Sequence, residues 1–253
     1  MIIPLPYGLW DATRHITSLT LKPITGADEL ALAEALADGA TPAAAGNLLL
    51  ARCTSADEAA TAHLTLGDRE TLLRALHVQN FGAHISAQTP CDSCGETIEY
   101  DLDLTHPPES PPEPGPRHHL PGTTIEIRLL TAADLETAAT AADPTGILLT
   151  AATGTAQLPP ETIATALTHL DPNAETRLTL ECPACAAANH RWLDSFDLIR
   201  RALGVASGGS AATFNGGILA QIHLLASRYG WSETDILALP RRRRLRYCAM
   251  ATA

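Results

Sequence analysis

Four of the six cysteines form two Cys-x-x-Cys pairs, and these are the residues of this chain best suited to chemistry. Cys91 and Cys94 lie in the segment PCDSCG, and Cys182 and Cys185 lie in ECPACA. Two intervening residues let the backbone turn back so that both sulfurs of a pair face one ion. Two such turns supply the four sulfurs of a tetrahedral zinc site. The sequence therefore predicts one structural zinc ion bound by Cys91, Cys94, Cys182 and Cys185.

Other interpretations of these cysteines are disfavoured. A disulfide within a pair would be strained and is rare in a reducing cytoplasm. A thioredoxin-like redox pair needs its first cysteine at a helix start, whereas Cys91 lies in an expected hairpin turn. Unliganded thiols are the remaining alternative, and His190 is interpreted as a solvated residue rather than as a substitute ligand. Four thiolates leave no open position for water, so the ion is expected to be structural and not catalytic.

Each cysteine pair is expected at the tip of a β-hairpin. A strand over 81–89 leads into Cys91, the segment 96–104 alternates apolar and polar residues, and a strand over 175–180 leads into Cys182. Positions 95–181 separate the two pairs, against about 15–20 residues in an ordinary zinc ribbon. The simplest arrangement is two facing hairpins with residues 105–176 as an insertion that includes a proline-rich loop, 106–116.

Helices are expected on both sides of the hairpins. The predicted class is α+β: a zinc-ribbon-like pair of β-hairpins with a helical insertion, plus C-terminal helices. Further strands are expected over 16–25 and 123–130. The expected helices cover 28–36 with Asp28 as cap, 42–50, a segment after Gly67-Asp68, 132–142, 160–170, 194–203 with Asp194 as cap, and three helices beyond residue 217. Ser232 and Asp235 form a capping-box-like pair for a short helix among these three.

The chain is expected to divide into four parts. Residues 1–63 form an N-terminal strand and helices, and residues 64–203 form the zinc-ribbon-like body with its insertion. Residues 204–217 are rich in Gly and Ser and are interpreted as a hinge. Residues 218–253 form a C-terminal helical segment that binds a partner.

Charge is distributed unevenly along the chain. The net charge is −11, yet the part from Arg191 onward contains nine Arg and four Asp or Glu, whereas the rest contains eight basic and twenty-four acidic residues. The C-terminal part is therefore expected either to meet an acidic partner or to fold back on the acidic body. No stretch reaches the ~20 consecutive apolar residues of a membrane-spanning helix. The N-terminus does not resemble a signal peptide, so a cytoplasmic location is expected.

No enzyme motif is present, and a non-enzymatic protein is expected. Phosphate-binding loops, nucleophile elbows and zinc-protease motifs are all missing from the sequence. Asp68, Arg69 and Glu70 are interpreted as a helix start with a solvated face. The pair His118-His119 is interpreted as exposed loop, and Cys53 and Cys248 as small core side chains.

The C-terminal segment carries the expected partner surface. An apolar stripe on one helix precedes an arginine run, which is expected to contact an acidic protein surface; nucleic acid is the alternative partner. The residues assigned to this surface are Ile218, Ile222, Leu225, Tyr229, Trp231, Arg241, Arg242, Arg243, Arg244, Arg246 and Tyr247.

Three segments together resemble the baseplate and tail-assembly (hub) proteins of contractile-tailed phages and phage-like contractile injection systems. They are LTLGDRETLLRAL with the following CDSCGETIEYDLDL, the returning LECPAC, and the tail ILAQIHLLASRYGWSETDILALPRRRRLRY. The resemblance implies a baseplate or hub component, or a factor that assembles one. Such proteins bind other tail proteins and catalyse nothing. They act in the cytoplasm during assembly or stay in the finished particle. The alternative function is a zinc-ribbon nucleic-acid-binding protein that uses its arginine-rich tail.

Overall fold

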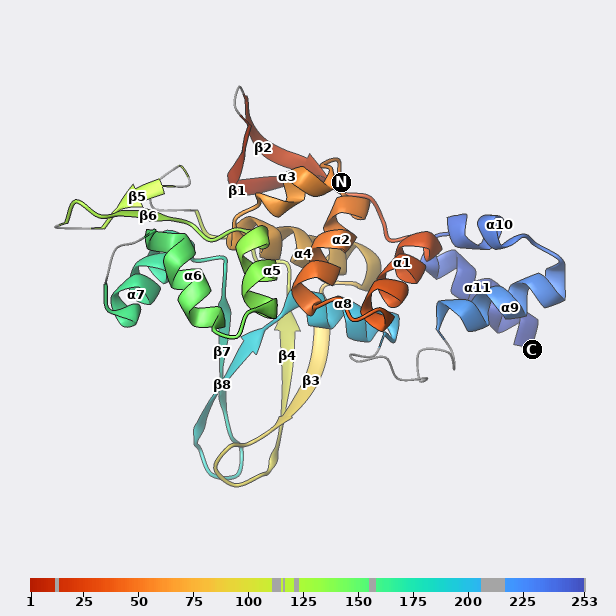
Figure 1. The fold of residues 1–253 in the computed structure, drawn as a ribbon. Helices are drawn as coiled ribbons and strands as arrows, with labels where there is room; N and C mark the ends of the chain where they lie inside the picture. The colour runs from red at the N-terminus through yellow and green to blue at the C-terminus, as the bar shows by residue number, and fades with distance from the viewer. Residues whose placement is uncertain are drawn as a thin grey trace.

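The computed structural model describes residues 1–11, 14–110, 115, 117–120, 123–154, 158–205 and 217–252. A central group of helices carries one hairpin on one side and two hairpins that project from the opposite side (Figure 1). A small group of helices and strands lies at one end of this body, and three C-terminal helices lie at the other (Figure 1). The described strands form four two-stranded antiparallel sheets. The α+β class is therefore confirmed, while the zinc-ribbon-like part stays a prediction.

The central body is built from helices with a leucine- and isoleucine-rich core. Its helices are α1 (Gly26–Ala37), α2 (Pro42–Cys53), α3 (Glu58–Ala62), α4 (Leu66–Phe81) and α8 (Ser195–Leu203). Leu49, Leu72 and Leu73 are among its fully buried side chains, at 0–1% exposure. The helix beginning at the Asp194 cap is confirmed, because the Asp194 side chain accepts a hydrogen bond from the backbone of Asp197.

Two local expectations in the N-terminal part are corrected. The cap of α1 is Thr25, and Asp28 is the third helical residue, whose carboxylate accepts hydrogen bonds from the Thr25 backbone and hydroxyl. The strand expected over 16–25 is β2 (Arg14–Thr20), and it pairs with β1 (Ile2–Asp11). Pro4 and Pro6 obscured β1 in the sequence. Each removes a backbone donor, and the register shifts between Pro4 and Leu9.

The middle segment adds helices and one short hairpin to the body. Its elements are β5 (Arg117–His119), β6 (Glu126–Arg128), α5 (Ala132–Thr140), α6 (Pro144–Thr153) and α7 (Pro160–Leu170). Helices over 132–142 and 160–170 are confirmed, whereas α3, α6 and β5 were not predicted. Backbone bonds from Leu66 to Leu130 and from Ala132 to Leu64 join this segment to the start of α4. Residues 111–114 and 116 of the proline-rich loop lie outside the described residues.

The two projecting hairpins are β3 (His84–Pro90) with β4 (Thr97–Asp103), and β7 (Thr176–Glu181) with β8 (Ala188–Leu193). Their strands pair without a bulge, and each hairpin ends in one cysteine pair. The predicted strand over 81–89 is shorter than expected because α4 continues through Phe81 and ends at Gly82. The backbone of Gly82 adopts φ 102° there.

The C-terminal helices are α9 (Ile218–Tyr229), α10 (Glu233–Ala238) and α11 (Arg241–Thr252). The predicted cap of α10 is confirmed, because the Ser232 hydroxyl accepts a hydrogen bond from the Asp235 backbone at 3.2 Å. Residues 206–216 of the expected hinge lie outside the described residues. Among the described helices, none has the length and apolar character needed to cross a membrane.

Candidate metal centre

The tips of the two projecting hairpins lie next to each other (Figure 1), and the four sulfurs of the two cysteine pairs converge there. The Sγ atoms of Cys91 and Cys185 are 3.7 Å apart, those of Cys94 and Cys182 are 3.6 Å apart, and all four lie within 4.8 Å of one another. A tetrahedral zinc ion with Zn–S bonds of about 2.3 Å separates its sulfurs by about 3.8 Å. The predicted convergence of the four cysteines is thus present, at spacings that suit a zinc ion.

The two cysteine turns have the same backbone geometry. The backbone N–H of Cys91 donates to the carbonyl of Glu96, and that of Gly95 donates to the carbonyl of Cys91. In the second turn Cys182 and Ala186 make the equivalent bonds. Gly95 and Ala186 both have positive φ angles, 77° and 56°. Because an alanine rarely adopts this conformation, the second turn holds a backbone strain that the first avoids with glycine.

Polar groups around Cys91 favour its thiolate form. Backbone N–H groups of Cys94 and Ser93 lower the pKa of the Cys91 thiol to about 6, and the Asn189 side-chain amide also donates to this sulfur. N–H groups directed at a cysteine stabilise the deprotonated sulfur that metal ions bind. In this way the first turn prepares a ligand before an ion binds.

Little apolar packing holds the two hairpins together near their tips. The buried cluster there consists of Cys91, Ile98 and Cys182, with Leu180 and Ala187 packed against it. Arg191 supplies a second link between the hairpins. Its guanidinium donates to the Thr89 hydroxyl, the Pro90 carbonyl and both carboxylate oxygens of Asp92 at 2.7–2.8 Å. With so small a core, a metal ion would be the main cross-link of this region.

The other cysteine and histidine predictions have mixed outcomes. His190 is exposed and lies near the Thr179 hydroxyl, as a solvated residue would. Cys53 is fully buried, as predicted, whereas Cys248 is partly exposed. The prediction for His118 is wrong. Its side chain is 4% exposed in β5, where its ring lies edge-on to Tyr7.

The prediction that Asp68, Arg69 and Glu70 form a solvated face is also wrong. All three are buried, because the first turn of α4 joins several elements of the body. Asp68 accepts bonds from the Tyr7 and Gly8 backbones, Arg69 donates to Asn47, and Glu70 accepts from the Ser195 backbone. These partners lie far away in sequence, so the local sequence gave no sign that Asp68, Arg69 and Glu70 are buried.

The arginine run of α11 is divided between the interior and the surface. Arg244 is fully buried, and its guanidinium contacts Glu29 of α1 together with Gln221 and the Leu239 carbonyl. Arg241 binds the other carboxylate oxygen of Glu29 at 2.8 Å. These contacts agree with the expected fold-back of the C-terminal part on the acidic body, whereas the assignment of Arg241 and Arg244 to a partner surface stays a prediction. Arg242, Arg243 and Arg246 are exposed.

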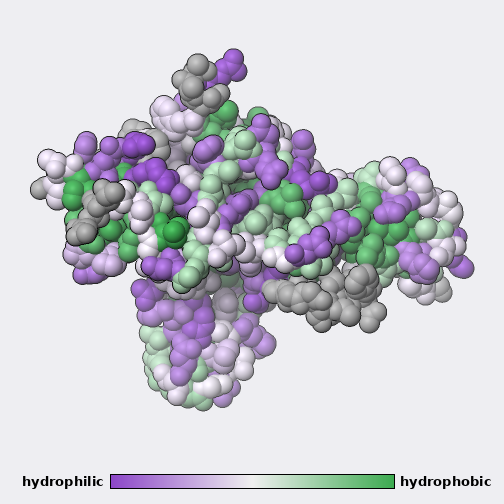
Figure 2. Space-filling view, in the orientation of Figure 1, coloured by the Kyte–Doolittle hydropathy of each residue, from purple (hydrophilic) through white to green (hydrophobic). Residues whose placement is uncertain are grey.

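The apolar stripe of α9 is divided in the same way. Ile218 and Leu225 are buried at 6% and 0% exposure, and Ile222 is partly buried. The ring of Tyr229 stacks on Trp231 at 5.1 Å, and the Tyr247 ring lies edge-on to Trp231 at 4.9 Å. Hydrophobic side chains gather on the C-terminal helices beside hydrophilic ones (Figure 2). Exposed hydrophobic residues there include Leu219, Tyr229, Leu245 and Met250.

Comparisons with known proteins identify the family. A family model described as T4 bacteriophage base plate protein matches residues 11–152, which is more than half of the chain. Neither a search of curated proteins nor a search of solved structures gives a significant match. The matched region contains the first segment of the resemblance and the first cysteine pair, whereas the LECPAC turn and the C-terminal tail lie beyond it. The chain therefore belongs to the T4 bacteriophage base plate protein family.

Proposed function

We propose that this protein is a structural or assembly component of the baseplate or hub in a contractile phage tail or a phage-like contractile injection system. The family match over residues 11–152 is the observation that carries this proposal. A baseplate component acts by holding other proteins in place, so we assign the chain no catalytic role. Its assembly would take place in the cytoplasm, after which the protein is either released or retained in the particle.

We further propose that a zinc ion bound by Cys91, Cys94, Cys182 and Cys185 fixes the projecting hairpins. The all-sulfur donor set, the spacing of the sulfurs and the small apolar cluster at the tips support this assignment. Four thiolates fill a tetrahedral shell, so the ion would supply stability and no reaction chemistry. A structural zinc contributes on the order of 10–16 kcal/mol of apparent binding free energy at neutral pH. The hairpin tips would therefore lose their arrangement without it.

The exposed side of the C-terminal helices is the proposed docking surface for another tail protein. Arg242, Leu245, Arg246, Ala249 and Met250 share one face of α11 and are all exposed. The aromatic group of Tyr229, Trp231 and Tyr247 lies in the same C-terminal segment, with Trp231 in the connection between α9 and α10. Aromatic and arginine side chains are enriched among residues that dominate protein interfaces. A partner with acidic residues around an apolar patch fits this surface.

Co-purification tests the proposal. The tagged protein is expressed with the other genes of its own tail cluster, and we expect it to retain at least one further baseplate or tail protein. Arg246→Glu should lose this partner, whereas Arg14→Glu, a change at an exposed arginine of β2, should retain it. Circular dichroism and zinc content show whether each variant is folded. The proposal is overturned if the folded wild-type protein binds no tail protein when all of them are present.

A further inference from the structure

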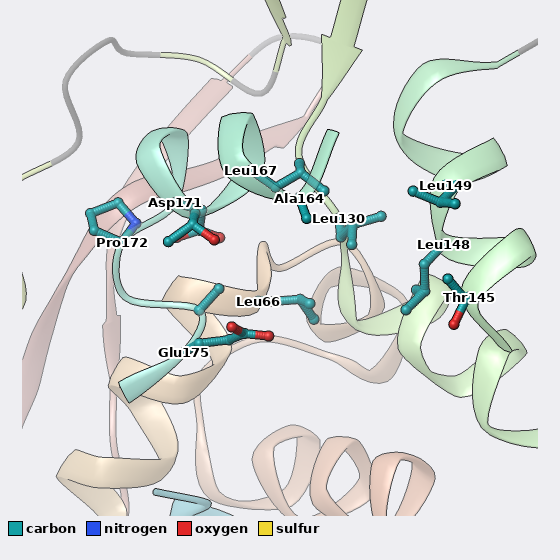
Figure 3. A pocket seen from close by; sticks show the side chains of 12 residues that line it. Leu66, Leu130, Thr145, Leu148, Leu149, Ala164, Leu167, Asp171, Pro172 and Glu175 are labelled. Carbon is teal, nitrogen blue, oxygen red and sulfur yellow. The ribbon is translucent and has the colours of Figure 1, made fainter. Parts of the chain in front are cut away.

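A small apolar pocket lies between α6, α7 and the start of α4 (Figure 3). Helices α6 and α7 lie at the end of the molecule opposite the C-terminal helices and away from the hairpin tips (Figure 1). Its volume is about 240 Å³. Pockets for drug-sized molecules and cofactors measure about 300–1,000 Å³, so this pocket suits one or two protein side chains. Its walls are formed mainly by partly buried leucines: Leu66, Leu130, Leu148, Leu149 and Leu167.

One carboxyl group, that of Asp171, lies among these leucines and is only 5% exposed. Its Oδ2 atom accepts a hydrogen bond from the Gly67 backbone at 2.9 Å. Its Oδ1 atom has no hydrogen-bond partner among the described residues. Figure 3 shows this carboxyl facing the leucines across the pocket. Burial raises the pKa of Asp171 to about 7, a further sign that its charge is poorly compensated.

A buried acceptor without a partner is costly and uncommon in folded proteins, so each such group calls for an explanation. The Asp171 oxygen plays no part in the cysteine site or in the contacts of α11. Glu175, an exposed residue of the same pocket, supplies a second carboxylate. The pocket thus combines apolar walls with two acidic groups, which is the chemistry that complements a long basic side chain.

We propose that this pocket receives an arginine or lysine side chain of another tail protein. The methylene stem lies against the leucines, and the cationic head binds Asp171 and Glu175. An anionic group would be repelled by both carboxylates, and a purely aliphatic side chain would leave the Asp171 oxygen unpaired. The chemistry of the occupant follows from the pocket itself, whereas its source in another tail protein rests on the proposed function.

Two matched small molecules test the chemistry of the pocket. Butylguanidinium imitates an arginine side chain, and butylurea has nearly the same shape without the charge. Both are titrated into the full-length protein and followed by ¹H–¹⁵N NMR. We expect butylguanidinium to bind at least tenfold more tightly and to shift signals of residues around the pocket. Equal affinity for the two molecules, or shifts confined to other regions, would overturn the proposal.

Three variants separate the role of each carboxylate from the effect of removing any negative charge near the pocket. Asp171→Asn should make the affinities for butylguanidinium and butylurea equal. Glu175→Gln changes an exposed position, so this variant should fold even if Asp171→Asn does not, and it should lower the ratio of the two affinities at least threefold. Glu161→Gln changes an exposed acid of α7 that does not line the pocket, so it should change nothing. If butylguanidinium still binds as much more tightly than butylurea in both Asp171→Asn and Glu175→Gln as in the wild type, these carboxylates do not bind the cation.

A photo-crosslinker tests the source of the side chain. Thr145, an exposed residue of the pocket, is replaced by p-benzoylphenylalanine in the assembled particle. We expect a crosslink to an arginine- or lysine-containing peptide of another tail protein, and we expect Asp171→Asn to weaken it. A crosslink to a second copy of this chain would overturn the choice of partner. Because the small-molecule titration needs no tail protein, it can succeed or fail independently of the proposed function.

Discussion

Replacing Glu29 by glutamine should release the C-terminal helices from the body. Glu29 is 2% exposed, and its two carboxylate oxygens each bind a different arginine of α11, Arg241 and Arg244. The other contacts of the Arg244 guanidinium, to Gln221 and to the Leu239 carbonyl, lie within the C-terminal part itself. Glu29 is therefore the main charged link between α11 and α1.

The free-energy cost of Glu29→Gln follows from the burial of its ion pairs with Arg241 and Arg244. Removing one partner of a buried ion pair costs about 3–5 kcal/mol, because the remaining charge stays buried without compensation. A loss of about 3 kcal/mol corresponds to a more than 100-fold increase in the fraction of molecules whose C-terminal helices are undocked. Glutamine keeps one carbonyl acceptor, so the cost of Glu29→Gln should be about 3 kcal/mol, at the lower end of this range.

Hydrogen exchange measured by mass spectrometry resolves this effect by region. In Glu29→Gln, amides of 218–252 should exchange faster, while amides of α2 and α4 keep their wild-type protection. Glu34→Gln, at an exposed position of α1, is the matched control and should leave every region unchanged. The reasoning is refuted if exchange over 218–252 is unchanged in Glu29→Gln, or if α4 loses protection to the same extent.

Three further predictions concern the cysteine turns and the buried acid. Cys182→Ser should give insoluble or metal-free protein, whereas His190→Ala should be as soluble as the wild type in an expression test. A left-handed backbone strains alanine, so Ala186→Gly should stabilise the second cysteine turn and Gly95→Ala should destabilise the first. Each change in the free energy of unfolding should be about 1 kcal/mol in urea unfolding of the metal-loaded protein. Two changes of the same sign would contradict this reasoning. The folded state holds the Asp171 proton more tightly than the unfolded state, with a pKa raised from 3.8 to about 7. The free energy of unfolding should therefore fall as pH rises from about 4 to about 7, by at most about 4 kcal/mol from this group. Asp171→Asn should flatten that dependence, and an unchanged pH profile would show that the carboxyl is not buried as described.

The sequence predicted best what is encoded locally. The alternating strands, the turn residues around Cys91 and Cys182, and the caps Asp194 and Ser232 are patterns of a few residues whose geometry follows directly from their chemistry. The convergence of the two cysteine pairs was also predictable, because a zinc site needs four ligands and each turn supplies two.

Features that depend on distant partners could not be predicted. The charges of Asp68 and Glu70 suggested a solvated helix start, yet their acceptor atoms meet backbone donors of Gly8 and Ser195, at remote positions. The burial of Arg244 depends in the same way on Glu29. One signal was available in the arginine run: positions 241 and 244 share a helical face, so an uneven distribution between interior and surface was a reasonable expectation.

The family resemblance is confirmed, and the first of the three segments that carried it lies inside the matched region. The matched region begins at residue 11 and includes most of the N-terminal part, and it ends at residue 152, before the second cysteine pair. Residues of α4, in LTLGDRETLLRAL, lie inside it and also form the buried junction of the body. The buried polar contacts of this segment thus belong to the part of the chain that the family shares.

The metal content of the purified protein tests the central claim most directly. Elemental analysis of the full-length chain, purified without chelators, should give one zinc ion per molecule, and X-ray absorption should show four sulfur neighbours at about 2.3 Å. Soluble, folded protein that contains far less than one equivalent of metal, or zinc with nitrogen or oxygen neighbours, would contradict the assignment of Cys91, Cys94, Cys182 and Cys185.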